Sequence, residues 1–285
     1  MPARPSASHV GALASYRGVG LIAAAGLVLG ATLVLAQSTT LPAPPSASTA
    51  SEATASSAFT PAQRKELQSI IKDVLLNNPE IMLEVQNALE AKMDKIQAER
   101  MAVAIKEHAG ELYRPVSSPV VGNANGDVPV IEFFDYNCGY CKKALSEVAH
   151  LVDTDKKVRL ILKEFPILAK GSEEASRVAL ATKLQGKYWE FHRAMLANQG
   201  QATEASALRV AEKIGLDMAR LRKDMASPEI KKEIEDTRQL ANKMGIQGTP
   251  HFIVGDRIIA GAPENLTELL GKHVSDVRKE GCKVC

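Results

Sequence analysis

The chain has 285 residues, of which 45% are hydrophobic and 24% are charged, so it is long enough for one substantial globular domain with additional segments. Its formal net charge of +2 gives no indication of nucleic-acid binding. The four cysteines form two Cys-x-x-Cys pairs, Cys138/Cys141 and Cys282/Cys285. Such pairs are compatible with a cytosolic reductase, a metal site or an exported redox protein.

Residues 1–36 have the composition of a secretory signal peptide. They contain Arg4 and Arg17 but no acidic residue, and an apolar stretch ends in the small-residue pattern Val34-Leu35-Ala36. The alternative is an uncleaved anchor in the inner membrane, because the apolar stretch approaches the length that spans a bilayer. Both interpretations place the cysteines outside the cytoplasm, where disulfides persist, and a periplasmic location is predicted.

Residues 37–58 consist mainly of Ser, Thr, Ala and Pro, which predicts a flexible linker. Residues 59–111 are then predicted to form an arm of two amphipathic helices, interrupted at Asn77-Asn78-Pro79. Thr60 and Gln63 have the spacing of a capping box at the start of the first helix, with a proline at its first helical position.

The second helix of this arm has a heptad-like apolar seam. Its members are Met82, Val85, Leu89 and Ile96. Two helices with a single aromatic residue, Phe59, cannot bury a core by themselves. We therefore expect the arm to associate with copies of itself, and packing onto the same chain is the alternative.

The segment around the first cysteine pair predicts a strand, a turn and a helix. The apolar run Val128–Phe134 indicates a buried strand, Asp135 and Asn137 are turn formers, and a helical pattern starts at Cys138. A helix start lowers the pKa of a thiol, because unpaired N–H groups and the helix dipole stabilise the thiolate. Cys138 is therefore the predicted nucleophile, and Cys141 is predicted to resolve the mixed disulfide.

The alternatives for this pair are half of a zinc site and a plain disulfide. A tetrahedral zinc ion needs four ligands, so one pair is not sufficient. The strand before the pair and the helix after it favour redox chemistry.

Two motifs resemble the DsbA-like branch of the thioredoxin superfamily. They are Glu132-Phe133-Phe134 followed by the Cys-x-x-Cys pair, and Gly248-Thr249-Pro250 followed by the apolar run 251–254. The resemblance implies a thioredoxin-like α/β fold with a helical insertion. It also implies a cis Pro250 that faces the cysteines, with Thr249 presenting its backbone to an extended substrate.

In the same family the acid matching Glu132 lies buried behind the cysteine pair and relays protons. The alternative for Glu132 is a strand-end acid that faces solvent, and Lys163 is its candidate partner. Lys142, Lys143 and His150 are interpreted as helix-surface residues, and His192 as a core residue.

The predicted thioredoxin domain covers residues 112–285, with the helical insertion at about 172–243. A broken edge strand is expected over 112–121 and another strand over 158–162. Strands at 251–254 and 257–260 are expected to form a hairpin around Gly255-Asp256, and a final helix is expected from about 263 to 279.

The arm resembles the N-terminal oligomerisation arm of ScsC-type proteins (suppressor of copper sensitivity C), notably in its Asn-Pro-Glu break. This resemblance implies a homo-oligomer, a trimer or a dimer.

The pair Cys282/Cys285 has no strand before it and no helix after it. A terminal disulfide is expected. A copper(I) or other soft-metal site and a second relay dithiol remain alternatives.

The dipeptide Gly139-Tyr140 departs from the Pro-His of the oxidase DsbA and matches the centre of the isomerase DsbC, which also has Thr before its cis proline. The chain is therefore predicted to be a disulfide isomerase or reductase for exported proteins that contain cysteines, working with a membrane redox partner. A DsbA-type dithiol oxidase is one alternative. A metal-binding protein that uses all four cysteines is an alternative of another class. No cofactor and no nucleic acid are expected.

Overall fold

The computed structural model describes residues 59–285, so the predicted signal peptide (1–36) and linker (37–58) lie outside the described residues. Residues 68–285 form one compact unit, and the described part of the other unit is the segment 59–67. Within the described range, no helix has both the length and the apolar character needed to cross a membrane.

Five strands form one mixed sheet in the order β1-β3-β2-β4-β5. The strands are β1 (Val120–Gly122), β2 (Val128–Phe134), β3 (Val158–Glu164), β4 (His251–Val254) and β5 (Arg257–Ala260). β2 and β3 are parallel, and the other neighbours are antiparallel. Every residue of the central strand β2 is buried, as its continuous apolar run predicts for a strand covered on both faces.

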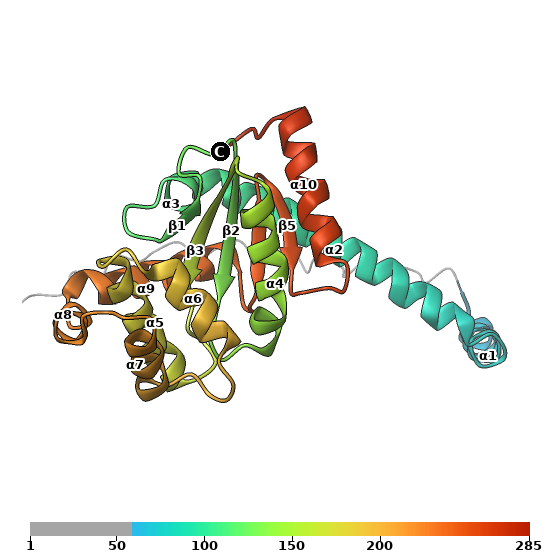
Figure 1. The fold of residues 1–285 in the computed structure, drawn as a ribbon. Coiled ribbons are helices and arrows are strands. Elements are labelled where there is room, and N and C mark those ends of the chain that lie inside the picture. Colours follow the sequence, from blue (N-terminus) through green and yellow to red (C-terminus); the bar gives the residue numbers. More distant parts are fainter. Residues whose placement is uncertain (1–58) are drawn as a thin grey trace, which may run out of the picture. The chain divides into compact units, whose positions relative to one another are not determined.

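Helix α4 (Gly139–Thr154) connects the parallel strands β2 and β3. Five helices lie between β3 and β4 in the sequence and form the predicted insertion, and α10 follows the β4–β5 hairpin. These helices are α5 (Lys170–Lys183), α6 (Tyr188–Ala197), α7 (Glu204–Lys213), α8 (Met218–Asp224), α9 (Pro228–Met244) and α10 (Leu266–Glu280). Figure 1 shows α5 to α9 beside the end of the sheet towards which β2 and β3 point. This is a thioredoxin-like α/β fold with a helical insertion, as expected.

The two faces of the sheet have separate cores. Val130 and Phe134 of β2 join one core with residues of α4, α5, α6 and α10, whereas Ile131 and Phe133 join the other with residues of α2, α3 and α9. Because side chains alternate along a strand, Glu132 projects to the same face as Val130 and Phe134, which is the face covered by α4.

Both arm helices are present, as α1 (Pro61–Asn77) and α2 (Glu80–Glu107). The predicted capping box is confirmed: the Thr60 N–H donates to Gln63 Oε1 at 2.9 Å, and the Gln63 N–H donates to Thr60 Oγ1 at 3.3 Å. α1 has no buried residue, and in α2 only Met101 and Ile105 are buried. The last turns of α2 therefore pack into the second core.

The expected edge strand over 112–121 is wrong for most of its length. Residues Ala109–Tyr113 form the short helix α3, and only Val120–Gly122 pairs with the sheet. Tyr113 is anchored in the second core, where its hydroxyl donates to Gly255 O at 2.7 Å. Pro115 and Pro119 lack the N–H that a longer ladder would need. The strand predicted over 158–162 extends to Glu164, and the β4–β5 hairpin is confirmed.

Candidate active site

Cys138 occupies the N-cap position of α4, and Cys141 lies in the first turn of that helix. Both thiols are free. Cys138 has 6% of its surface exposed, whereas Cys141 has none. The Cys138 N–H donates to Asp135 O at 3.0 Å, which closes the turn between β2 and α4. The sequence therefore predicted the place of the pair correctly.

The environment of Cys138 favours its thiolate. A hydrogen bond from the Cys141 side chain is the main cause that lowers the pKa of Cys138 to about 5. The hydroxyl of Thr249 and the backbone N–H groups of Cys141 and Tyr140 act in the same direction, and burial opposes them. Because its pKa is lowered below neutral pH, Cys138 is the candidate nucleophile of the pair.

Cys141 has the opposite character. Burial raises the pKa of Cys141 far above the ordinary value of a thiol, and its hydrogen bond to Cys138 raises it further. Because Cys141 remains a thiol, it needs a proton acceptor before it can attack. The two cysteines therefore differ in acidity: the pKa of Cys138 is lowered and the pKa of Cys141 is raised.

The loop before β4 faces Cys138. β4 pairs with β2 so that His251 lies opposite Phe133, which brings this loop beside the turn after β2. The Thr249–Pro250 bond is cis, as the resemblance implied. The Cys138 thiol donates to the carbonyl oxygen of Thr249 at 3.1 Å. The Thr249 hydroxyl is buried without a well-aligned partner among the described residues, so it is available to a thiolate.

Glu132 is buried behind the cysteine pair, with 1% of its surface exposed, so the solvent-facing alternative is wrong. Burial raises the pKa of Glu132 to about 8, and the negative charge of the Cys138 thiolate contributes. The carboxyl group is therefore mainly protonated at pH 7 and titrates close to it, which suits a group that exchanges protons with a thiol.

Lys163 is not the partner of Glu132. The register places Leu162 opposite Glu132 and places Lys163 opposite Phe133, so Lys163 projects to the other face of the sheet. There its ammonium donates to Glu111 O at 3.0 Å and to Ser118 Oγ at 2.8 Å. The pairing register of β2 with β3, which decides the face on which Lys163 lies, cannot be predicted from the sequence.

A second buried acid, Glu164, lies at the end of β3 and was missed from the sequence. Tyr136 donates to its Oε1 at 3.2 Å, Tyr188 donates to the same oxygen at 2.7 Å, and Ser176 donates to Oε2 at 2.7 Å. Burial raises the pKa of Glu164 to about 8. An acid inside an apolar strand was the available signal, as it was for Glu132. The network joins the active-site turn to α5 and α6.

Two polar residues fix the turn before Cys138, and their roles were also missed. The buried carboxylate of Asp135 accepts from the N–H groups of Asn137 (2.7 Å), Ile167 (2.8 Å) and Leu168 (2.9 Å). The Asn137 side chain donates to Ala202 O at 3.0 Å and accepts from the Ala202 N–H at 2.8 Å. The turn is therefore held by the loop before α5 and by the segment between α6 and α7.

The other basic residues near the pair are occupied elsewhere, as expected for surface and core residues. Lys142 donates to Asn198 O and Gly200 O, at 3.3 and 2.9 Å. His150 is exposed. His192 is buried, and burial lowers the pKa of its imidazole to about 3, so it is neutral at physiological pH.

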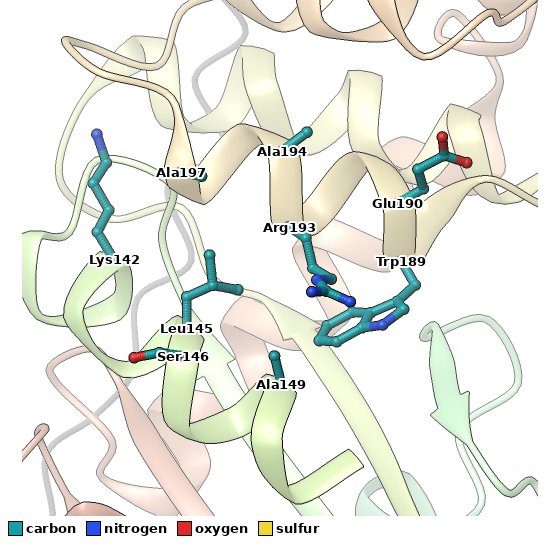
Figure 2. A pocket seen from close by; sticks show the side chains of 9 residues that line it. All are labelled: Lys142, Leu145, Ser146, Ala149, Trp189, Glu190, Arg193, Ala194 and Ala197. Atoms are coloured by element: carbon teal, nitrogen blue, oxygen red, sulfur yellow. The ribbon is translucent and has the colours of Figure 1, made fainter. Parts of the chain in front are cut away.

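A groove of about 710 Å³ runs between α4 and α6, and Figure 2 shows the side chains that line it. Its lining contains neither cysteine and neither residue of Thr249–Pro250. Arg193 lies over the ring of Trp189, 5.8 Å from the ring centroid, and pairs with Asp153 at 3.8 Å. No thiol lines the groove, so the thiol chemistry is assigned to the cysteine pair.

The terminal pair Cys282–Cys285 forms a disulfide, which confirms that expectation. The four cysteines do not converge: Arg278 of α10 binds Asp127 at the start of β2, whereas Cys138 follows the end of that strand. A single metal site made of all four cysteines is therefore excluded by geometry. Among residues 59–285, no group of three or more His, Cys, Asp or Glu side chains is arranged to hold a metal ion.

A thioredoxin-like fold with a free Cys-x-x-Cys pair at a helix start defines the class of thiol–disulfide oxidoreductases. Residues 129–270 match the DSBA-like thioredoxin domain, and residues 63–94 match the copper resistance protein ScsC N-terminal domain. A thioredoxin-like oxidoreductase from Silicibacter pomeroyi DSS-3 is 45% identical to this chain, with a TM-score of 0.57. The match covers 60% of this chain and 97% of that protein's chain. The chain belongs to the DsbA-like thioredoxin family.

Two other proteins are similar to this chain. One match covers more of the chain than the thioredoxin domain, and the other is to a much longer protein. ScsC from Proteus mirabilis, in a transitional conformation, is 25% identical, covers 77% of this chain and 100% of its own, and has a TM-score of 0.56. The Na⁺/H⁺ antiporter NhaA 1 of Salinispora arenicola is 29% identical and covers 59% of this chain but only 27% of its own length. The chain spans about a quarter of the length of these first curated relatives.

Proposed function

We propose that the protein rearranges or reduces disulfides in exported proteins in the periplasm, acting as a disulfide isomerase or reductase. The observation that carries this proposal is the position of the Cys138 sulfur, which lies 3.1 Å from the backbone carbonyl oxygen of Thr249. A nucleophile beside the backbone of the loop before β4 suits an extended polypeptide that brings its disulfide to the sulfur.

The first step is the attack of the Cys138 thiolate on one sulfur of the substrate disulfide. The Cys138–substrate bond forms, the substrate S–S bond breaks, and the other substrate sulfur leaves as a thiolate. In isomerisation, another substrate thiolate then attacks the mixed disulfide and restores the Cys138 thiolate, with no net transfer of electrons.

In reduction, Cys141 resolves the mixed disulfide instead. Glu132 in its carboxylate form accepts the proton of Cys141, and the resulting thiolate attacks the sulfur of Cys138. The substrate leaves as a dithiol and the enzyme keeps a Cys138–Cys141 disulfide, so two electrons have moved to the substrate. A membrane redox partner that supplies two electrons is then needed for the next cycle.

A dithiol oxidase of the DsbA type is the second candidate, and one observation favours it. The low pKa of Cys138, about 5, stabilises the reduced pair. A stabilised reduced form makes the corresponding disulfide more oxidising. The Gly139-Tyr140 dipeptide and the arm argue for the isomerase direction instead.

The arm supports an oligomer, because residues 59–285 leave many of its apolar side chains exposed. In α1, Ile70, Ile71 and Val74 are 52%, 52% and 44% exposed, and in α2 Val85 and Leu89 are 56% and 58% exposed. Full burial of each such side chain contributes about 2 kcal/mol, so several together can offset the entropy cost of association. A trimer or dimer would present several Cys138 sites to one substrate.

The test is deletion of residues 59–94, which removes the matched arm but keeps Met101 and Ile105 in the second core. Light scattering should change from an oligomer to a monomer, and refolding of scrambled ribonuclease should slow while insulin reduction persists. A monomeric parent protein, or unchanged ribonuclease refolding, would contradict the isomerase proposal.

A pair of substitutions gives a finer test of the same proposal. Val85→Glu with Leu89→Glu places two charges in the seam, whereas Asn87→Glu with Ala91→Glu places two charges at the same spacing outside it. The seam variant should be monomeric and the control should remain oligomeric. If both variants behave alike, the seam is not the interface.

A further inference from the structure

The terminal disulfide Cys282–Cys285 lies on a well-anchored part of the chain. In the last turns of α10, Arg278 binds Asp127 and Asp155 at 2.8 and 2.6 Å, and Glu280 binds Arg257 at 2.5 Å. Cys282 is half-buried against the first core, whereas Cys285 is exposed. The disulfide is therefore presented to solvent from a fixed position.

This disulfide contributes little as a structural clip. The stabilisation from a disulfide grows with the length of the loop that it closes, and this one closes only residues 282–285. Both cysteines follow the last helix, so the bond joins no two elements of the fold. Exposed disulfides of this kind are the ones that exchange readily.

The position of the pair separates it from the active site. Arg278 contacts Asp127, which immediately precedes β2. Cys138 lies beyond the other end of this strand, which is seven residues long. Seven residues of strand span roughly 20 Å, which is too far for direct exchange between the two pairs of one chain. Figure 1 likewise shows the C-terminus at the end of the sheet opposite to the point of the β2 arrow.

We infer that Cys282–Cys285 is a second exchangeable disulfide, which accepts two electrons from a Cys-x-x-Cys dithiol carried by another protein molecule. The inference goes beyond the proposed function and does not depend on it. The incoming thiolate attacks the exposed sulfur of Cys285, and a new S–S bond forms there while the Cys282–Cys285 bond breaks. Cys282 leaves as a thiolate, and the second thiol of the partner then resolves the mixed disulfide.

Two features stabilise the leaving thiolate. The N–H of Cys285 donates to the sulfur of Cys282 at 3.1 Å, and a hydrogen bond to the charged form of a thiol favours that form. Lys279 and Lys283, both exposed, supply positive charge beside the pair. After the second step the partner holds a disulfide, and Cys282 and Cys285 are a dithiol that has gained two electrons and two protons.

The test uses two variants of the full mature chain as probe and target. The probe is Cys282→Ser/Cys285→Ser, reduced at Cys138 and Cys141, and the target is Cys138→Ser/Cys141→Ser, oxidised at its terminal pair. After mixing and acid quenching, alkylation and peptide mass mapping should show alkylated Cys282 and Cys285 in the target. A probe that also carries Cys138→Ser should transfer nothing.

A trapping variant locates the attacked sulfur. The probe Cys141→Ser/Cys282→Ser/Cys285→Ser retains only Cys138, so it should form a mixed disulfide with Cys285 of the target and not with Cys282. Dithiothreitol serves as an access control. If dithiothreitol reduces the target but the probe does not, the Cys138/Cys141 dithiol of another copy does not supply the electrons, and this outcome counts against the inference. If neither reduces it before unfolding, the terminal pair is only structural and the inference is wrong.

These outcomes are separable from the proposed function. Ribonuclease refolding by the Cys282→Ser/Cys285→Ser variant reports on Cys138 and Cys141 alone. If the parent chain shows no ribonuclease refolding, the proposed function is contradicted. If no electrons reach the terminal pair, only the inference about Cys282–Cys285 is contradicted.

Discussion

The two Cys-x-x-Cys pairs have the same spacing, but one lies at a helix N-terminus and the other follows a helix C-terminus. Cys138 is the N-cap of α4, and Cys282 follows the C-cap residue Gly281 of α10. The first pair is a dithiol and the second is a disulfide. A helix N-terminus stabilises a thiolate, whereas a helix C-terminus opposes negative charge.

The comparison teaches that the spacing of two cysteines does not set their chemistry. What distinguishes the first pair is the set of groups around Cys138. The Cys141 thiol lowers the pKa of Cys138 most, and the Thr249 hydroxyl and the N–H groups at the start of α4 lower it further. The second pair has one N–H donor and nearby lysines, at the surface. The first is suited to attack other disulfides, and the second to being attacked.

The largest expected difference between the pairs is in catalysis. Cys138→Ser should reduce the rate of insulin reduction by about three orders of magnitude or more, because the nucleophile is lost. Cys285→Ser should change this rate less than about twofold, since the terminal pair lies at the other end of the sheet. Equal losses in the two variants would mean that both pairs take part in one reaction path.

The next largest effect is expected at Glu132, the buried acid near the first cysteine pair. Glu132→Gln should slow the resolution of mixed disulfides by about 10- to 100-fold, because Cys141 loses its proton acceptor. Single-turnover reduction followed by mass spectrometry measures this step. Attack by Cys138 itself should change little, since its thiolate is formed at a pH at which Glu132 is still protonated.

The same substitution should stabilise the protein, with a defined pH dependence. Burial raises the pKa of Glu132 from 4.5 to about 8, so the unfolded chain ionises first and stability falls as pH rises between these values. Glu132→Gln should therefore add about 3 kcal/mol at pH 7 and almost nothing at pH 4. Urea unfolding at the two pH values tests this, with exposed Glu264→Gln as the neutral control.

Removal of the terminal disulfide should have a smaller effect. Cys282→Ser/Cys285→Ser should lower the free energy of unfolding by no more than about 2 kcal/mol, because the loop contains only four residues. Thermal unfolding of the parent and the variant, both with the first pair reduced, measures the difference. A loss of 4 kcal/mol or more would show that the bond is a structural clip.

The smallest expected effect is at Thr249. Thr249→Val removes the hydroxyl that helps to stabilise the Cys138 thiolate, so the pKa of Cys138 should rise from about 5 to no more than about 6. Thr249→Ser keeps the hydroxyl and is the matched control. A serine variant that shifts as far as the valine variant would assign the effect to packing.

Local sequence signals predicted much of the fold and of the site. The apolar run of β2, the capping box at Thr60, the hairpin turn at Gly255 and the helix that starts after Cys138 are encoded by neighbouring residues, and the structure has all of them. The sequence also suggested that Glu132 is buried, because an acid interrupts an apolar strand.

What the sequence could not predict depends on register and on contacts between distant segments. Lys163 was proposed as the partner of Glu132, but the pairing of β2 with β3 places it on the other face. The network around Glu164 joins three segments that are 12 to 28 residues away from it in the sequence. The helix at Tyr113 replaces an expected strand because its side chain fills the second core.

The central claim is that the Cys141 thiol, the Thr249 hydroxyl and the backbone N–H groups at the start of α4 together make Cys138 the reactive thiolate. The most direct test is a pH titration of thiolate absorbance near 240 nm, on the reduced Cys282→Ser/Cys285→Ser variant, with alkylation mapping at each pH. The structure predicts one transition with a midpoint at about pH 5 that belongs to Cys138, with no ionisation of Cys141 up to neutral pH. A midpoint near 8.5, the value of an ordinary thiol, or earlier labelling of Cys141 than of Cys138, would contradict it.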